Sequence, residues 1–100
     1  MRNVILVFIL LCTINVFSQT AKEYLNTGIV KFRLQEYREA IAKYDKAIQI
    51  NPDFLKAFIG RGIAKIYLGD NRGAIADFNK AIQINPNDTR ALNNRGIAKM

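Results

Sequence analysis

Lys46-Ala47-Ile48-Gln49-Ile50-Asn51-Pro52 recurs without a change as residues 80–86 of the same chain. The two copies lie 34 residues apart, and alignment of residues 21–54 with 55–88 gives 16 identities in 34 positions. Residues 89–100 continue the series, with 6 identities to residues 55–66. A fixed period of this length is typical of proteins that stack one structural unit. The sequence therefore predicts two full units, 21–54 and 55–88, and a partial third unit, 89–100.

Each unit is expected to fold as two helices joined by a short turn. In residues 37–50 apolar side chains recur at i, i+1, i+4, i+7 and i+8, which places them on one helical face, and residues 71–84 repeat this spacing. Pro52 and Pro86 end these second helices, because proline lacks a backbone N–H and disfavours helical backbone in the preceding residue. Gly69 suits the left-handed turn after a helix.

The expected helices cover about residues 22–34, 37–50, 56–68, 71–84 and 89–100, with a turn near residues 35–36 in the first unit. Asp88 or Thr89 is expected to cap the last helix. These elements leave no segment that alternates as a strand would, so the predicted fold class is all-α.

The recurring positions resemble the tetratricopeptide repeat, a 34-residue helix-turn-helix unit marked by small, aromatic and proline residues. The resemblance covers residues 21–100 and implies an α-solenoid of antiparallel helix pairs, wound as a right-handed superhelix, with about two and a third repeats. Runs such as R-G-x-A-K and L-G-D resemble bacterial members of the family. The structural positions are Gly28, Ala40, Tyr44, Ala47 and Pro52 in the first unit, Gly62, Ala74, Phe78, Ala81 and Pro86 in the second, and Gly96 in the third.

Two positions of the first helix depart from the family pattern, because they hold cations where Leu and Tyr are usual. Arg61 and Arg95 fill one, and lysines at 31, 65 and 99 fill the other. A buried unpaired cation is costly, so these heads must reach water or a carboxylate. Asp77 is the nearest candidate partner. We favour a structural ion pair over a binding role at this position, since such pairs are common in proteins.

The resemblance also implies a protein–protein interaction scaffold, in which the first helices of the units line a concave groove for a peptide or partner helix. Cations at its edge, amides and an apolar centre would suit a partner with acidic character. The alternative is that these residues are ordinary solvated surface and stacking positions. By position, the candidate peptide-binding residues are Lys22, Asn26, Arg33, Lys56, Tyr67, Arg90, Asn93 and Asn94.

One specialisation of the family can be tested against the sequence. Members that grip the C-terminal carboxylate of chaperones use lysine, asparagine and arginine at five positions of the first helices. Only one of the five matching residues here is compatible with that clamp, so we expect no chaperone-tail binding by this mechanism. The five are Leu25, Ile29, Gly60, Arg90 and Asn94.

Residues 1–18 differ from the rest of the chain, because they hold 13 of its 50 apolar residues and a single charge, Arg2. The apolar run over 4–17 is shorter than the roughly 20 residues that span a bilayer, and it suits a secretory signal peptide cleaved after Ser18. An uncleaved anchor or a lipidated Cys12 are the alternatives. We therefore expect the repeat region, 19–100, to be exported to the periplasm or cell envelope, or secreted.

The composition excludes most catalytic chemistry. The chain has no His, and its one Cys and one Ser lie within residues 1–18, so nucleophilic triads and the usual zinc ligands are missing from the repeat region. We expect no enzyme activity, no metal, no cofactor and no small-molecule substrate. Fifteen Lys/Arg against eight Asp/Glu give a net charge of +7, but the cations are dispersed and form no run of the kind that binds nucleic acid.

Two further readings stay open at this point. The chain could be the N-terminal accessory part of a larger exported enzyme or sensor. It could instead associate with itself through the exposed last helix, because a solenoid of about two and a third units leaves an apolar face uncovered.

Overall fold

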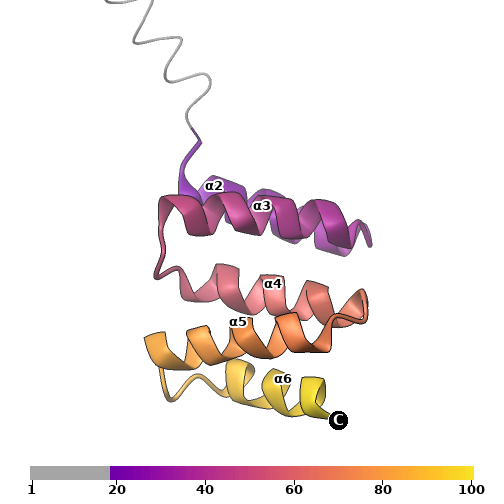
Figure 1. Ribbon diagram of the computed structural model, residues 1–100. Helices are drawn as coiled ribbons and strands as arrows, with labels where there is room; N and C mark the ends of the chain where they lie inside the picture. The colour runs from indigo at the N-terminus through magenta and orange to yellow at the C-terminus, as the bar shows by residue number, and fades with distance from the viewer. Residues whose placement is uncertain (1–18) are drawn as a thin grey trace, which may run out of the picture.

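The computed structural model describes residues 19–100, and every element of secondary structure in that range is a helix. The helices are α2 (Ala21–Arg33), α3 (Tyr37–Ile50), α4 (Leu55–Tyr67), α5 (Asn71–Ile84) and α6 (Thr89–Lys99). Helices α2 and α3 form one antiparallel pair, α4 and α5 form a second, and α6 lies at the far end of the stack (Figure 1). The predicted all-α fold is confirmed. The predicted signal peptide lies outside the described residues.

Helix boundaries agree closely with the prediction. Residues 37–50 and 71–84 are helical as expected, whereas α2 and α4 each begin and end one residue earlier than predicted and α6 ends one residue earlier. For α2 the reason is a cap that the sequence analysis missed. The Thr20 side chain accepts a hydrogen bond from the Glu23 backbone N–H at 3.1 Å, which satisfies a free donor at the helix start.

The turns inside the two units share a left-handed residue. Gly69 has φ of +82°, as its predicted role requires, and the matching residue of the first unit, Gln35, has φ of +62°. After each full unit the chain turns differently. The side chains of Asn51 and Asn85 accept hydrogen bonds from backbone N–H groups two residues on, at 3.2 and 3.1 Å. These Asx turns lead the chain into the next unit.

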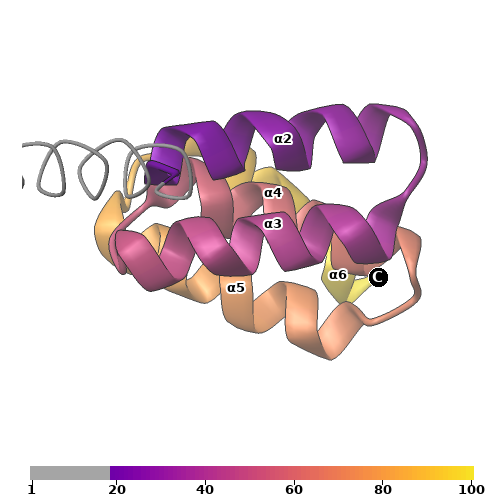
Figure 2. The ribbon, with the colours of Figure 1, turned by 90° about the horizontal axis from the view of Figure 1, so that it is seen from above.

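Small residues bring the helices close together along the stack. Ala40, Ala47, Ala74 and Ala81 are completely buried on the inner faces of α3 and α5. Seen along the stack, α2 and α5 lie on opposite sides with α3 and α4 between them (Figure 2). The core is therefore a chain of small clusters, each shared by neighbouring helices, as expected for a solenoid.

Candidate functional site

A cavity of about 360 Å³ opens beside the first helices of the three units. Only one lining residue, Tyr44 of α3, comes from a second helix. We call this cavity the groove pocket. Its lining consists of Leu25, Ile29, Phe32 and Arg33 from α2, Tyr44 from α3, Lys56, Ile59, Gly60 and Ile63 from α4, and Arg90 from α6.

The floor and the rim of the groove pocket differ in chemistry. Leu25 and Ile59 are almost completely buried, with 5% and 4% of their surfaces exposed, and the other apolar lining residues are half-buried. Arg33, Lys56 and Arg90 are exposed at the rim. No carboxylate is among the lining residues. An apolar side chain can be desolvated on this floor while a negative group near it meets cations at the edge.

Tyr44 shapes the floor because two glycines receive its ring. A Cβ built on Gly28 would lie 2.6 Å from the ring, and one built on Gly60 would lie 2.8 Å from it. Burial raises the pKa of the Tyr44 hydroxyl. Sequence reasoning identified Tyr44 as the wedge between units and missed that it also lines the pocket. The signal available was that Tyr44 stands 16 residues after one glycine and 16 before the other.

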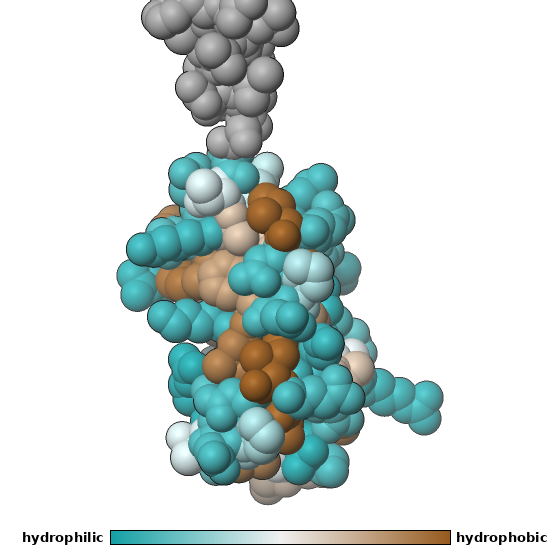
Figure 3. Space-filling view, turned by 90° about the vertical axis from the view of Figure 1, so that its left-hand side faces the viewer, coloured by the Kyte–Doolittle hydropathy of each residue, from teal (hydrophilic) through white to brown (hydrophobic). Residues whose placement is uncertain are grey.

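A second cavity of about 450 Å³ lies beside the groove pocket, toward the ends at which α2 and α4 begin. It shares Leu25, Ile29 and Lys56 with the groove pocket and adds Lys22 and Asn26 together with apolar residues of the turn before α4. Figure 3 looks at this end of the helices and shows brown apolar surface interrupted by teal polar side chains. The two cavities form one continuous lining across α2 and α4.

The structure divides the eight candidate peptide-binding residues into three sets. Arg33, Lys56 and Arg90 line the groove pocket, and Lys22 and Asn26 line the second cavity, which Lys56 also reaches. The other three lie outside both cavities. They are Tyr67 on α4 and Asn93 and Asn94 on α6.

Tyr67 belongs to an aromatic cluster at the opposite end of α4. Its ring stacks on Tyr37 with centroids 4.9 Å apart, and it meets Phe32 edge-on at 5.2 Å. Sequence reasoning missed this cluster, because the three residues occupy unrelated positions of the repeat and no spacing links them. On α6, the Asn94 side-chain amide donates to the Arg90 carbonyl at 2.8 Å.

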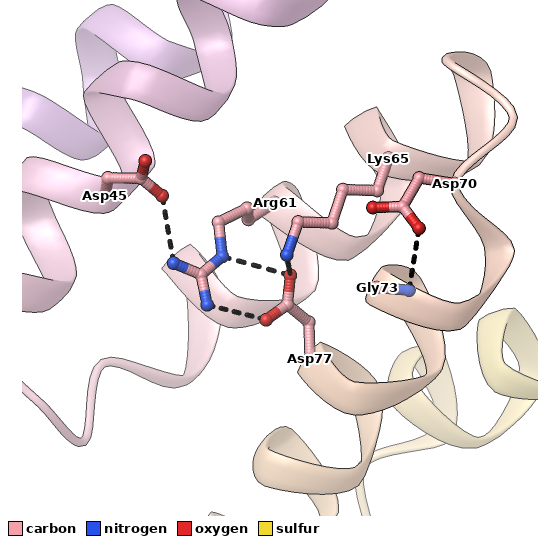
Figure 4. A network of polar contacts seen from close by, with 6 residues as sticks. All are labelled: Asp45, Arg61, Lys65, Asp70, Gly73 and Asp77. Atoms are coloured by element: carbon pink, nitrogen blue, oxygen red, sulfur yellow. Dashed lines mark hydrogen bonds and ion pairs between the residues drawn. The ribbon is translucent and has the colours of Figure 1, made fainter.

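Arg61 joins three helices through carboxylates on both sides (Figure 4). Its Nε and Nη2 donate to the two oxygens of Asp77 at 3.0 and 2.6 Å, and its Nη1 donates to Asp45 at 2.9 Å. Lys65 Nζ lies 3.0 Å from the same Asp77. The bond to Asp77 is the main reason that the pKa of Arg61 is raised. The predicted pairing with Asp77 is confirmed, and the contact with Asp45 is additional.

The positions of a carboxylate clamp carry the wrong chemistry here. Leu25, Ile29 and Gly60 form part of the pocket floor and offer no side-chain donor. Arg90 is at the rim and is paired with Asp88 at 3.0 Å. Within residues 19–100 no group of His, Cys, Asp and Glu side chains could hold a metal ion. No helix in that range is both long and apolar enough to cross a membrane.

Comparison with known families gives two matches. A profile described as "Tetratricopeptide repeat" matches residues 21–54, and one described as "TPR repeat" matches residues 64–100. The chain contains tetratricopeptide repeats. No curated protein matches the chain.

Solved tetratricopeptide domains have the same architecture. The second such domain of human RPAP3, in complex with an HSP70 peptide, is 27% identical with a TM-score of 0.79, and the match covers 81% of this chain and 68% of that one. The TPR2B domain of yeast Sti1, in complex with a pHsp70 ligand, is 30% identical with a TM-score of 0.78, covering 82% and 66%. MamA is 27% identical with a TM-score of 0.80, covering 85% of this chain and 50% of MamA.

Proposed function

We propose that this chain is a protein-interaction module that binds a peptide segment or partner helix along the groove pocket. The observation that carries the proposal is the pocket itself, an apolar floor of Leu25, Ile29 and Ile59 with cations at its rim. Its volume of about 360 Å³ falls within the roughly 300–1,000 Å³ that is usual for ligand pockets. Structurally similar tetratricopeptide domains in complex with HSP70 peptides support the same use of the fold.

The preferred ligand is an amphipathic acidic segment. A large apolar side chain would gain free energy by leaving water on the pocket floor. Acidic neighbours in the ligand would approach Arg33 and Lys56, which are exposed and take part in no ion pair with a described residue. Because rim charges act mainly through steering and specificity, binding should weaken as salt increases.

The ligand is recognised within its chain and not at its carboxyl end. A terminal carboxylate needs donors at the clamp positions, and three of those positions here are Leu25, Ile29 and Gly60. An internal segment presents a side chain to the same floor without placing a second charge there. This distinguishes the chain from its HSP70-binding structural relatives in the way it holds a peptide.

Export is part of the proposal. The apolar run over residues 4–17 after Arg2, and the small residue Ser18, support a signal peptide that leaves a mature chain beginning at Gln19. The module would then act in the periplasm or cell envelope of a bacterium, or outside it, by binding and not by catalysis. The reading as an accessory region of a larger exported enzyme or sensor stays an alternative. N-terminal sequencing of the chain from an envelope fraction tests the export proposal, and a chain that retains Met1 overturns cleavage.

An array of C-terminally amidated peptides tests the groove. Each peptide carries one Leu or Phe flanked by Glu, by Gln or by Lys, and binding to the full chain is measured by fluorescence anisotropy. We expect Glu-flanked peptides to bind at least ten times more tightly than Lys-flanked ones. Lys56→Glu should reduce that binding about tenfold or more, since it reverses a charge at the rim.

Lys46→Glu is the matched control, because Lys46 is exposed on α3 and lines neither cavity. It makes the same change in net charge at a distance from the pocket. Equal loss in both variants would show that only overall charge matters and would overturn the groove assignment. Tighter binding of the same peptides with a free C-terminal carboxylate would overturn internal recognition.

A further inference from the structure

Three glycines 34 residues apart have different surroundings. A Cβ built on Gly28 would lie 2.6 Å from the ring of Tyr44, and one built on Gly62 would lie 2.6 Å from the ring of Phe78. In both cases the ring belongs to the residue 16 positions later. A Cβ built on Gly96 meets no heavy atom within 4 Å. Gly96 therefore presents on α6 the seat that holds an aromatic ring on the other two helices, with no ring in it.

The charged groups around that seat are also half used. Arg61 has carboxylate partners 16 residues before and 16 residues after it, whereas the matching Arg95 bonds only backward, from Nη1 to the Asn79 side-chain oxygen at 3.0 Å. Lys65 is paired with Asp77, and the matching Lys99 has no ion-pair partner among residues 19–100. Two cations on α6 thus lie where α4 receives a carboxylate.

The apolar residues of α6 on this side are uncovered as well. Leu92 is 39% exposed, although the matching Phe58 is 7% exposed. Ile97 is 55% exposed, although the matching Ile63 is packed against two core clusters. An apolar strip, an open ring seat and two cations therefore coincide on one side of α6, which we call the free face.

The helix that covers the same side of α4 shows what the free face can accept. Helix α5 contributes Phe78 to the glycine seat, Asp77 to the cations, and the fully buried Ala74 and Ala81 to close contact. The pattern is small-x2-Asp-aromatic-x2-small. A helix with this pattern would satisfy Arg95 and Lys99 and fill the seat over Gly96.

The sequence itself offers no unused helix of this kind. The two helices that carry an aromatic residue beside an aspartate, α3 and α5, are already packed in the stack. Residues 1–18 contain no acidic residue. A second copy of α6 would bring Arg90, Arg95 and Lys99 toward the same cations, which is repulsive.

We propose that the free face of α6 docks an amphipathic helix of a partner protein with the pattern small-x2-Asp-aromatic-x2-small. The charge complementarity is direct, since the face offers cations and the helix brings one carboxylate beside its ring. This surface is separate from the groove pocket, whose only residue on α6 is Arg90. The docking mode is that of a helix laid against an apolar strip.

A capped peptide with the sequence of residues 71–86 is the probe, because it carries the required pattern. Its binding to the full chain is followed by fluorescence anisotropy. We expect saturable binding that weakens at least tenfold when the peptide carries Asp77→Lys or Phe78→Ala. Gly96→Leu in the protein should also weaken binding at least tenfold by filling the seat. Its circular dichroism should be unchanged, since a side chain at Gly96 meets no neighbour.

Lys56→Glu serves as the control for the other site, since it lies at the groove pocket and should leave binding of this peptide unchanged. A loss with Lys56→Glu and none with Gly96→Leu would place the peptide in the groove and overturn the proposal. Equal binding to the parent chain and Gly96→Leu would mean that the peptide displaces α5, which also overturns it. Absence of saturable binding at millimolar peptide, or sedimentation showing a dimer that Gly96→Leu abolishes, overturns it in favour of no partner or a second copy.

Discussion

Arg61-Gly62-Ile63-Ala64-Lys65 on α4 and Arg95-Gly96-Ile97-Ala98-Lys99 on α6 are the same five residues in two environments. The first run lies between helices on both sides, and the second lies at the end of the stack. Ala64 and Ala98 are alike, with 0% and 4% exposure, because each packs toward the preceding unit. The other positions differ, because their contacts come from the helix that follows.

The difference shows that each first helix has one side specified backward and one side specified forward along the chain. Arg95 retains its backward bond to Asn79 and lacks the forward carboxylate that Arg61 has in Asp77. Identical residues therefore contribute different free energies of unfolding. Substitutions made in pairs at matching positions measure that difference directly, since the chemistry of each pair is the same.

Removing the forward carboxylate should give the largest effect. Asp77→Ala leaves Arg61 and Lys65 without their shared partner at a side chain that is only 4% exposed. Breaking a buried pair costs about 3–5 kcal/mol, and because both cations are about a fifth exposed and can reach water, we expect about 2–3 kcal/mol here. Urea unfolding followed by circular dichroism measures it.

Asn79→Ala is the matched control, because Asn79 is the partner of Arg95 and is exposed. Its expected cost is within about 0.5 kcal/mol. Similar losses for the two substitutions would contradict the difference in environment between the two runs.

The isoleucines of the two runs should differ by somewhat less. Ile63 is packed against the clusters around Phe58 and Phe78, so Ile63→Ala should cost about 2 kcal/mol, the lower end of the range for a core truncation. Ile97 is 55% exposed, and Ile97→Ala should cost less than about 0.5 kcal/mol. Thermal unfolding of both variants at one concentration decides the comparison. A destabilisation by Ile97→Ala as large as that by Ile63→Ala would mean that Ile97 is covered in solution.

The glycines should respond with opposite signs. In Gly62→Ala the new methyl group meets the buried ring of Phe78, an overpacking cost of about 1–3 kcal/mol that exceeds the gain of up to about 1 kcal/mol in helix propensity. Gly96→Ala has only the gain, so it should stabilise the chain by up to about 1 kcal/mol. Both free energies come from the same urea experiment. Destabilisation by Gly96→Ala would show that the seat is occupied.

Features that arise within one unit could be predicted from the sequence. The period and the prolines gave helix limits to within a residue, and Gly69 has the left-handed backbone that its place in the turn demands. The bond of Arg61 to Asp77 was expected because both belong to one unit. Five of the eight candidate groove residues line the two cavities, since repeat position indicates which side of a first helix is exposed to the groove.

Features that need the angle between units could not be predicted in this way. Asp45 reaches Arg61 from the preceding unit, and Tyr44 reaches the pocket through two glycines on different helices. The aromatic cluster at Tyr37 and Tyr67 joins positions that the repeat does not relate. Spacing within a unit assigns a side chain to a face, but the partner on that face depends on how one unit is rotated on the next.

The starts of α4 and α6 provide the smallest and most local comparison. Asp88 accepts hydrogen bonds from the Arg90 and Ala91 backbone N–H groups at 3.0 and 3.1 Å, whereas Phe54 caps α4 without a side-chain bond. The side chain of Arg90 is the main cause that holds the pKa of Asp88 below its usual value, and the backbone N–H groups add to it. A carboxyl with a lowered folded-state pKa stabilises above its unfolded pKa, about 3.9, and loses that contribution as the pH falls through the folded value.

Lowering the pH from 5 to 3 should therefore reduce amide protection at the start of α6, at Ala91 and Leu92, before it affects Ala57 and Phe58 at the start of α4. Hydrogen exchange expressed as protection factors measures both helices in one sample. Asp88→Asn should keep a capping oxygen and remove the pH dependence, since asparagine caps helices about as well as aspartate but does not titrate. A loss of protection at α6 that persists in Asp88→Asn would trace the pH effect to another group. If protection falls equally at both helix starts, the stack responds to acid as a whole, and α6 at its end is no less firmly held than α4 within it.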